Sequence, residues 1–225
     1  MNSKVNEKCW YVPVCSEVGK NCEYCSKYAE MKFLMEHSWL PKSKQKPMPA
    51  LKPDTDNDAE MFEQLDDIRM NIRDFVKSGR NLYIGSSCTG NGKTTWAIKL
   101  LHKYFERIWD CNCYRVRGLF VHVPTLLLRL KNFNDPMSAQ EYALLKECDL
   151  IIWDDIAAGD LSNYDYGQLL AIIDYRLLAE KSNIYTSNIA TEKELVEVLG
   201  NRLASRVYKS SKVIIFDGKD NRTDG

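Results

Sequence analysis

From about residue 60 onward, short runs of apolar residues alternate with longer segments in which apolar residues recur at helical spacing. Continuous apolar runs predict buried strands, and they occupy residues 81–85, 118–123, 149–155, 183–188 and 212–216. Helical spacing predicts helices at 60–77, about 92–109, 124–133, 138–147, about 165–179, 191–198 and 200–208. Strands and helices in alternation predict an α/β fold whose parallel sheet is covered by helices on both faces.

The apolar pattern is interrupted at residues 41–59, a stretch that contains four prolines and several lysines. Proline lacks a backbone N–H donor and disfavours helix in the residue before it. We therefore expect three parts: a small cysteine-rich module at 1–40, a linker at 41–59 and the main α/β domain at 60–225.

The sequence GSSCTGNGKTT lies where the first strand turns into the next helix. A P-loop has this context, because its backbone N–H groups and the helix N-terminus bind phosphate oxygens. Lys93 is expected to be exposed in the empty site and to reach the β- and γ-phosphates, while Thr94 places its hydroxyl on Mg²⁺. Ser87 stands where the usual motif has its first glycine. The predicted nucleotide-binding residues are Ser87, Cys88, Thr89, Gly90, Asn91, Gly92, Lys93, Thr94, Thr95 and Asp154.

Two acids follow the apolar run at 149–153. Oxygen ligands suit Mg²⁺, so Asp154 is predicted to hold this ion together with Thr94. Asp155 is predicted to orient or deprotonate the attacking water. The next strand ends in Thr-Ser-Asn, and Asn188 is the candidate for contact with the γ-phosphate or the water, although simple turn chemistry also explains these residues.

Arg202 and Arg206 lie four residues apart on a predicted helix and therefore share one of its faces. A solvated helix face is the simpler interpretation. The alternative is an arginine finger, which completes the nucleotide site of a neighbouring subunit by neutralising charge in the transition state.

Four cysteines, Cys9, Cys15, Cys22 and Cys25, fall within the first 25 residues. The two-residue gap between Cys22 and Cys25 is the spacing that places two thiolates on one metal, so the four predict a structural Zn²⁺ site, with His37 as a substitute ligand. Such an ion would stabilise a module too small to fold on its own core. The remaining cysteines are expected to pack in the core: Cys88, Cys111, Cys113 and Cys148.

Composition limits the class of protein. Lysine plus arginine and aspartate plus glutamate both number 31, so no overall basic charge points to nucleic acid. The sequence shows neither a secretory signal pattern nor an apolar stretch long enough to cross a bilayer, which predicts a cytoplasmic protein without a membrane partner. In that compartment thiols stay reduced.

The motifs GNGKTT, LIIWDDI, YTSNI and NRLASRV together resemble those of the DnaC/DnaI-type replicative helicase loaders, a branch of the AAA+ ATPases. The resemblance covers residues 62–222 and implies a P-loop ATPase domain whose helical lid is reduced or absent. Small size and the cysteine-rich N-terminus resemble phage-encoded loaders. By this resemblance Arg206 is the arginine finger, Arg202 is its companion, and Arg222 is a substitute nucleotide contact.

The resemblance implies an ATP-dependent protein that binds a hexameric replicative helicase through its zinc module and helps place it on single-stranded DNA. It also implies self-association on the helicase and weak ATP hydrolysis that partners stimulate. Arg129, Lys131 and Phe133 lie on a helix that touches DNA in this family, although a solvated basic edge explains them equally well. Two alternatives remain: a helicase-binding adaptor or inhibitor with little ATP turnover, and a transposition helper ATPase related to IstB.

Overall fold

The computed structural model describes residues 9, 12, 15, 22, 25–108, 114–131, 137–159 and 161–220. At its centre lies one five-stranded sheet, in which every adjacent pair of strands is parallel. The strand order is β2-β3-β4-β1-β5. The strands are β1 (Asn81–Ser86), β2 (Gly118–His122), β3 (Leu150–Asp154), β4 (Ser182–Ser187) and β5 (Ser211–Phe216). All five predicted strands are therefore present.

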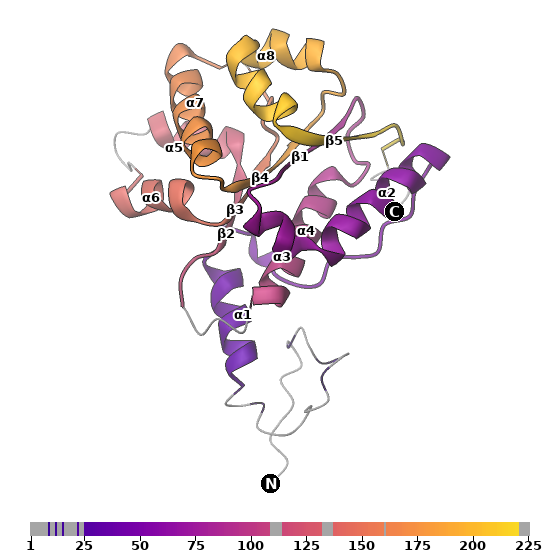
Figure 1. Ribbon diagram of the computed structural model, residues 1–225, viewed down its shortest axis with the longest axis vertical. Coiled ribbons are helices and arrows are strands. Elements are labelled where there is room, and N and C mark those ends of the chain that lie inside the picture. The colour runs from indigo at the N-terminus through magenta and orange to yellow at the C-terminus, as the bar shows by residue number, and fades with distance from the viewer. Residues whose placement is uncertain are drawn as a thin grey trace.

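Helices cover both faces of the sheet, as the alternation predicts (Figure 1). One face packs against α2 (Asp56–Met70), α3 (Ile72–Lys77) and α4 (Lys93–Ile108), and the other against α5 (Val123–Lys131), α6 (Ala139–Glu147), α7 (Asn163–Leu178) and α8 (Glu192–Ala204). Successive residues of β1 point to opposite faces: Leu82 and Ile84 belong to the first core, whereas Tyr83 belongs to the second. Strand geometry requires this alternation, and burial on both faces explains why the strand is apolar throughout.

One helix boundary differs from the prediction. The helix expected at 60–77 is two helices, α2 and α3, separated at Asn71, whose φ of −107° and ψ of 24° leave the helical region. The break expected between the helices at 191–198 and 200–208 is present, because Gly200 within α8 has a non-helical backbone with φ 71°, and the π-helix η5 (Ser205–Lys209) follows α8 directly. Glycine adopts this conformation without the clash that a Cβ would cause.

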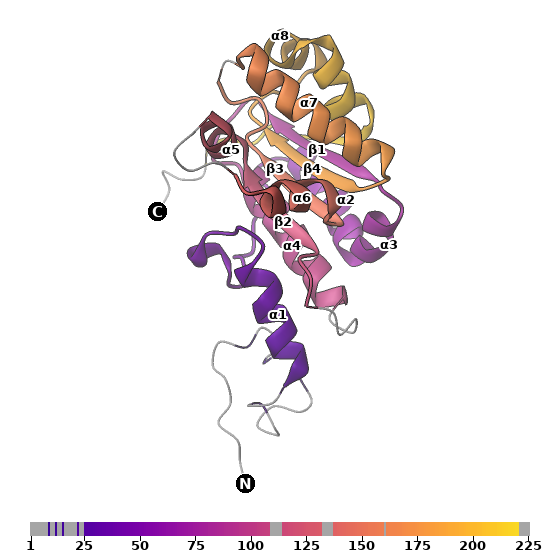
Figure 2. The same cartoon turned by 90° about the vertical axis from the view of Figure 1, so that its left-hand side faces the viewer.

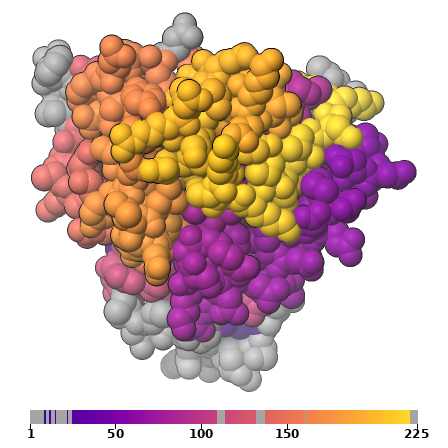
Figure 3. Space-filling model, turned by 45° about the horizontal axis from the view of Figure 1, so that its top comes forward, coloured from indigo at the N-terminus to yellow at the C-terminus, as the bar shows by residue number. Residues whose placement is uncertain are grey.

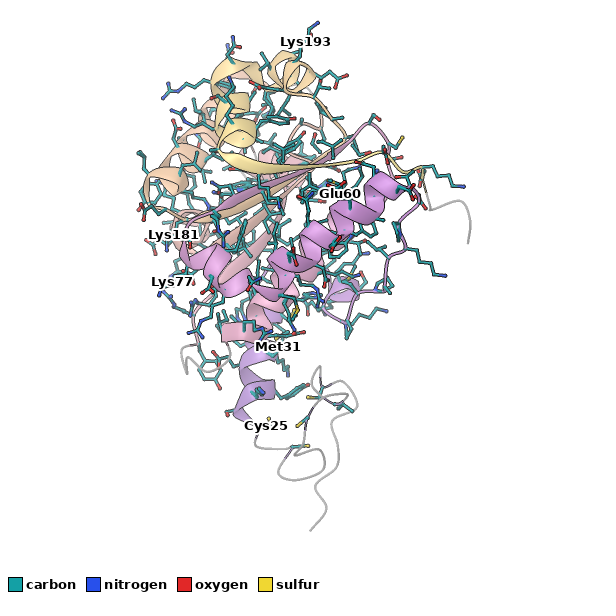
Figure 4. All side chains as sticks on the ribbon, turned by 45° about the vertical axis from the view of Figure 1, so that its right-hand side comes forward. Cys25, Met31, Glu60, Lys77, Lys181 and Lys193 are labelled. Carbon is teal, nitrogen blue, oxygen red and sulfur yellow. The ribbon has the colours of Figure 1, made fainter. Side chains whose placement is uncertain are left out.

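Helix α1 (Ser26–Glu36) packs against α4, and its buried residues belong to the same core as α2 and α4. These residues are Met31, Leu34 and Met35, and Leu40 joins them beyond the helix. Figure 4 shows Cys25 at the outer end of α1 and Met31 nearer the body of the domain. The apolar side chains of this segment thus pack in the core, and the domain boundaries at 40 and 59 stay predictions.

A second view along the sheet shows α1 extending below β2 (Figure 2). The N–H of Phe120 in β2 donates to the carbonyl of Ser38 at 2.7 Å. Because β2 lies at the edge of the sheet, this contact covers part of the edge, which would otherwise present unpaired backbone groups.

Arg176 in α7 is fully buried and joins this helix to the end of α6 and the start of β4. Its guanidinium donates to the carbonyls of Cys148 (2.9 Å) and Ser182 (2.6 Å) and to Oδ1 of Asn183 (2.7 Å). Burial lowers the pKa of the Arg176 guanidinium. Since a buried cation is costly unless its donors are satisfied, these acceptors make the arrangement stable.

Candidate functional site

The carboxyl ends of the parallel strands meet at one edge of the sheet, where open α/β sheets bind ligands. The P-loop connects β1 to α4 there, across residues 87–92. Gly90 and Gly92 have φ values of 70° and 96°, which lie in the left-handed region that favours glycine. The loop therefore curls as the motif requires, and α4 begins at Lys93. Thr95 follows in the first turn of α4, and Ser87, in place of the usual glycine, is exposed.

Lys93 lies inside the curl of the P-loop, and only 6% of it is exposed. Its Nζ donates to the carbonyl of Cys88 at 2.6 Å and to Oδ1 of Asn91 at 2.9 Å. The expectation that Lys93 is exposed in the empty site is therefore wrong. The physical reason is that the ammonium donates to acceptors of its own loop, which hold it at the place where phosphate oxygens are expected.

Ser86, the last residue of β1, stabilises the P-loop from beneath. Its Oγ accepts the N–H of Cys88 at 3.0 Å and Nδ2 of Asn91. The segment after β5 also contacts the loop, because Thr89 donates its hydroxyl to Asp220 at 2.9 Å. Between β5 and Asp220 the structure describes no helix.

Asp154 joins three elements at this edge. Its Oδ1 accepts the hydroxyl of Thr94 from α4 and that of Thr186 from β4, both at 2.8 Å. Burial raises the pKa of the Asp154 carboxyl, and the nearby Asp155 carboxylate acts in the same direction, whereas the two hydroxyls oppose them. A divalent cation beside this carboxylate would offset both effects, so Asp154 and Thr94 fit the predicted Mg²⁺ site.

Asp155 has a φ of 57°, which is unusual for a residue other than glycine. Its N–H donates to Oγ1 of Thr186 at 3.1 Å and holds this turn. Its carboxylate is partly exposed, and Oδ2 lies 3.8 Å from Nε2 of His122 at the end of β2. Asp155 is therefore placed at the predicted edge, next to a histidine that sequence reasoning missed.

Asn188 is exposed just beyond the end of β4. In the structure Thr186, two residues earlier, makes the direct contact with Asp154. The strand order β2-β3-β4 explains both Thr186 and His122, because it places the ends of β2 and β4 on either side of Asp154. Sequence alone does not fix strand order, although the polar residue at each strand end is a usable signal.

Arg202 and Arg206 share one partner, Asp174 of α7. Arg206 Nε lies 2.6 Å from Oδ1 of Asp174, and Arg202 Nη2 lies 3.2 Å from Oδ2. The side chain of Arg206 is 42% exposed, and that of Arg202 is 64% exposed. The surface over α7 and α8, coloured orange to yellow, faces the viewer in Figure 3. The pair thus lies on one face, as predicted, and Asp174 is a partner that the sequence pattern did not reveal.

The basic residues of α5 make ion pairs within the chain. Arg129 donates from both terminal nitrogens to Glu141, at 3.0 and 3.3 Å, and Lys131 Nζ lies 2.6 Å from Asp165. The Arg129 hydrogen bonds lower the pKa of Glu141 to about 2. Phe133, the third candidate for DNA contact, lies outside the described residues, as does Arg222.

The four N-terminal cysteines are partly exposed and are not joined in disulfides. Among the described residues, one group of three potential metal ligands lies within 4.8 Å of one another, and it does not include a cysteine. The structure therefore does not support the predicted Cys₄ zinc site. His37 stacks on Phe33 and contacts its carbonyl.

Cys148 is buried, as expected for a packing residue, and burial raises the pKa of its thiol to about 11. Cys88 is partly exposed within the P-loop. Cys111 and Cys113 lie outside the described residues.

A five-stranded parallel sheet of this order, with the glycine-rich loop after β1 and acidic residues at the end of β3, is a fold that solved structures of replication proteins share. The crystal structure of the DnaC helicase loader has this fold, with a TM-score of 0.62 and 20% identity, covering 74% of this chain and 93% of that one. The crystal structure of DnaI gives 0.65 and 18%, covering 82% and 95%. AMPPCP-bound DnaA from Aquifex aeolicus gives 0.56 and 15%, covering 83% and 50%. At these identities the likeness shows a shared fold.

No protein-family model and no curated protein matches the sequence. Within the described part of the chain, no helix combines the length and apolar character needed to cross a membrane.

Proposed function

We propose that this protein is an ATP-dependent loader that binds a hexameric replicative helicase and helps place it on single-stranded DNA. The observation that supports the proposal is the junction of Thr94, Asp154 and Thr186 beside the P-loop, because it places the two predicted Mg²⁺ ligands, Thr94 and Asp154, within hydrogen-bond distance of each other. Support for the helicase as partner comes from the fold, which DnaC and DnaI share.

In this proposal Lys93 leaves Cys88 and Asn91 and contacts the β- and γ-phosphates of ATP. Thr94 and Asp154 hold Mg²⁺, which neutralises charge on the phosphate oxygens. DnaA, a protein of the same fold, has been crystallised with the nucleotide analogue AMPPCP. Nucleotide binding at the same edge of the sheet is therefore chemically reasonable for this chain.

Hydrolysis is assigned to Asp155, which orients or deprotonates the attacking water, with Asn188 close to the γ-phosphate. Arg206 acts as a finger in the site of a neighbouring subunit, and Arg202 accompanies it. In the isolated chain both arginines are engaged by Asp174, so hydrolysis by a single subunit is expected to be slow. Assembly on the helicase would bring the finger of one subunit to the nucleotide of the next.

The proposal is tested by mixing the full chain with the replicative helicase of its host and following co-elution with and without ATP. Steady-state ATPase rates are measured in parallel, with the helicase, single-stranded DNA, both or neither. We expect a stable complex and an ATPase rate that rises on addition of the helicase. Lys93→Ala is the control, because it removes nucleotide binding and leaves the outer surface unchanged. Failure to bind any replicative helicase would contradict the loader proposal.

A helicase-binding adaptor with little ATP turnover is the second candidate. The engagement of both arginines by Asp174 favours it, because an arginine that keeps this partner after assembly would not reach the nucleotide of a neighbouring subunit. The same assay separates the two functions. An adaptor binds the helicase but hydrolyses ATP at an unchanged low rate in every mixture.

Contact between α5 and single-stranded DNA requires Arg129 and Lys131 to exchange Glu141 and Asp165 for phosphates. Exposed ion pairs contribute only about 0–1 kcal/mol, so this exchange is feasible for Arg129. Lys131 is held more firmly, because Asp165 is 1% exposed. We therefore expect Arg129→Ala to weaken binding of a fluorescent oligonucleotide more than Lys131→Ala does.

Zinc remains to be measured. The Cys22–Cys25 spacing predicts one zinc per chain, although no group of three potential metal ligands among the described residues includes a cysteine. Elemental analysis of protein purified without chelator tests this prediction. A Cys22→Ser/Cys25→Ser variant that retains zinc would show that any bound ion is held elsewhere.

A further inference from the structure

A histidine and two aspartates converge where β2 and β3 end. The two strands are parallel neighbours, and their register pairs His122 directly with Asp154. Asp155 follows Asp154 in the chain, and its left-handed backbone turns it beside the same histidine. One ligand atom from each of the three residues lies within 4.8 Å of the others. Ligand atoms around a single cation are separated by similar distances.

A hydrogen bond orients the imidazole of His122 so that its second ring nitrogen can act as a metal ligand. Its Nδ1 lies 2.8 Å from Oγ1 of Thr125, a residue in the first turn of α5. In the tautomer that carries its proton on Nδ1, the ring donates to this hydroxyl and directs the lone pair of Nε2 towards Asp155. Metal-binding histidines are commonly held by such a hydrogen bond on the second nitrogen.

We propose that His122, Asp154 and Asp155 form a binding site for a first-row transition-metal dication, and that this site takes the ion without nucleotide. It shares Asp154 with the Mg²⁺ site of the proposed ATPase, but its other ligands are His122 and Asp155, whereas the Mg²⁺ site uses Thr94 and the nucleotide phosphates. An imidazole ligand favours Mn²⁺ or a softer dication, whereas Mg²⁺ selects oxygen ligands. The side chains of His122 and Asp155 are 43% and 36% exposed, so an ion can enter from solvent and keep water in its remaining positions.

The charges at the site favour a cation. Asp154 and Asp155 place two carboxylates beside each other, and Asp154 is buried. The two hydroxyls that reach Asp154 both approach Oδ1, so Oδ2 is the oxygen available to an ion. Binding a dication between the carboxylates removes their mutual repulsion, which gives the site affinity even when no phosphate is present.

The test uses the full chain without nucleotide and Mn²⁺ alone as the probe. Free Mn²⁺ is followed by its electron paramagnetic resonance signal, which broadens on binding. We expect one Mn²⁺ per chain, with weak competition from Mg²⁺. His122→Ala should lower the Mn²⁺ affinity by more than about 10-fold, and Thr125→Val by about 10-fold, since outer hydrogen bonds to metal ligands typically contribute 10- to 100-fold.

Glu192→Gln is the control, because it removes a partly exposed carboxylate that pairs with Lys209 and belongs to no group of potential metal ligands among the described residues. It should leave Mn²⁺ binding unchanged. Thermal unfolding shows whether each variant is folded, and His122→Asn provides a second substitution should the alanine variant fail. The proposal is overturned if wild-type protein does not bind Mn²⁺ without nucleotide, or if both folded His122 variants bind it as tightly as wild type.

Because the readout is metal binding without nucleotide, it is independent of the proposed ATPase activity. Loss of ATP hydrolysis with intact Mn²⁺ binding would contradict the proposed function alone. Intact hydrolysis with absent Mn²⁺ binding would contradict this site alone.

Discussion

In two regions of the molecule, a single aspartate bridges two side chains. The first region is the edge of the sheet where the strands end and where we propose that nucleotide binds, here called the nucleotide edge. There Asp154 joins Thr94 and Thr186, and only 6% of Asp154 is exposed. On the surface formed by α7, α8 and η5, here called the arginine face, Asp174 joins Arg202 and Arg206, whose side chains are 64% and 42% exposed. The geometry of the two bridges is similar, but their environments differ.

Environment decides how readily each bridge opens. Exposed ion pairs contribute about 0–1 kcal/mol, so Arg206 can leave Asp174 for a phosphate at little cost. A buried carboxylate that loses a hydrogen-bond partner is destabilised by about 1–3 kcal/mol or more unless an ion replaces that partner. The Asp154 bridge is therefore expected to stay closed unless an ion binds, whereas the Asp174 bridge is expected to open more readily.

The largest expected effect tests the arginine face. Arg206→Ala should bind ATP almost normally yet lose about 10³- to 10⁵-fold in hydrolysis rate, the contribution typical of an arginine finger. Calorimetry measures binding, and steady-state assays in the presence of the helicase measure hydrolysis. Lys209→Ala is the matched control, since Lys209 lies on the same π-helix and pairs with Glu192 instead.

Subunit mixing shows whether the finger acts in a neighbouring site. Arg206→Ala and Asp155→Asn chains, each inactive alone, should recover part of the activity together, because one interface then combines an intact site with an intact finger. A mixture that stays inactive although both variants assemble would mean that Arg206 is only a surface arginine. Full specific activity in dilute monomer would mean the same.

The second largest effect is expected on stability, and it distinguishes the buried Arg176 from Arg202 and Arg206. Arg176 lies two residues beyond Asp174 on α7, but it is buried and donates to carbonyls of neighbouring elements. Arg176→Met leaves several buried acceptors without a partner, so we expect a loss of about 3–5 kcal/mol in the free energy of unfolding. Urea unfolding measures it, and Arg202→Met, an exposed change, should cost less than about 1 kcal/mol. Equal losses would show that Arg176 contributes no more than a surface ion pair.

The parts of the molecule that sequence predicted well are those that local pattern determines. Apolar runs located all five strands, and the glycines with Lys93 located the P-loop. Helix breaks were less accurate, because Asn71 is compatible with a helix and only its observed backbone separates α2 from α3.

Residues that act across elements were harder to predict. His122, Thr125 and Asp174 acquire their roles from strand order and helix packing, which bring together positions distant in the chain. A lone histidine at a strand end carries no local signal of its partners. The burial of Lys93 was missed for a similar reason, since its acceptors are fixed by the fold of the empty loop.

The third effect tests the nucleotide edge. Lys93→Ala should lower ATP affinity by at least about 100-fold, because a hydrogen bond to a charged group contributes about 1.5–3 kcal/mol and Lys93 is proposed to contact two phosphates. Calorimetric titration with ATP and Mg²⁺ measures the change. Lys99→Ala is the control, since Lys99 lies on the same helix, beside the ring of Trp96. Unchanged affinity in Lys93→Ala would refute the P-loop assignment.

The smallest expected effect tests the Asp174 bridge itself. Asp174→Asn keeps the size of the side chain but removes the charge that engages Arg202 and Arg206. If the bridge only restrains the arginines, its loss should raise the ATPase rate at low protein concentration by up to about 5-fold, which corresponds to the roughly 1 kcal/mol of an exposed pair. The increase should vanish at high concentration or with helicase, where assembly already supplies the competing phosphate. It should also be absent when Arg206→Ala is present in the same chain. A decrease in rate at every concentration would instead show that Asp174 positions the finger, and the two bridges would then be alike in function as well as in geometry.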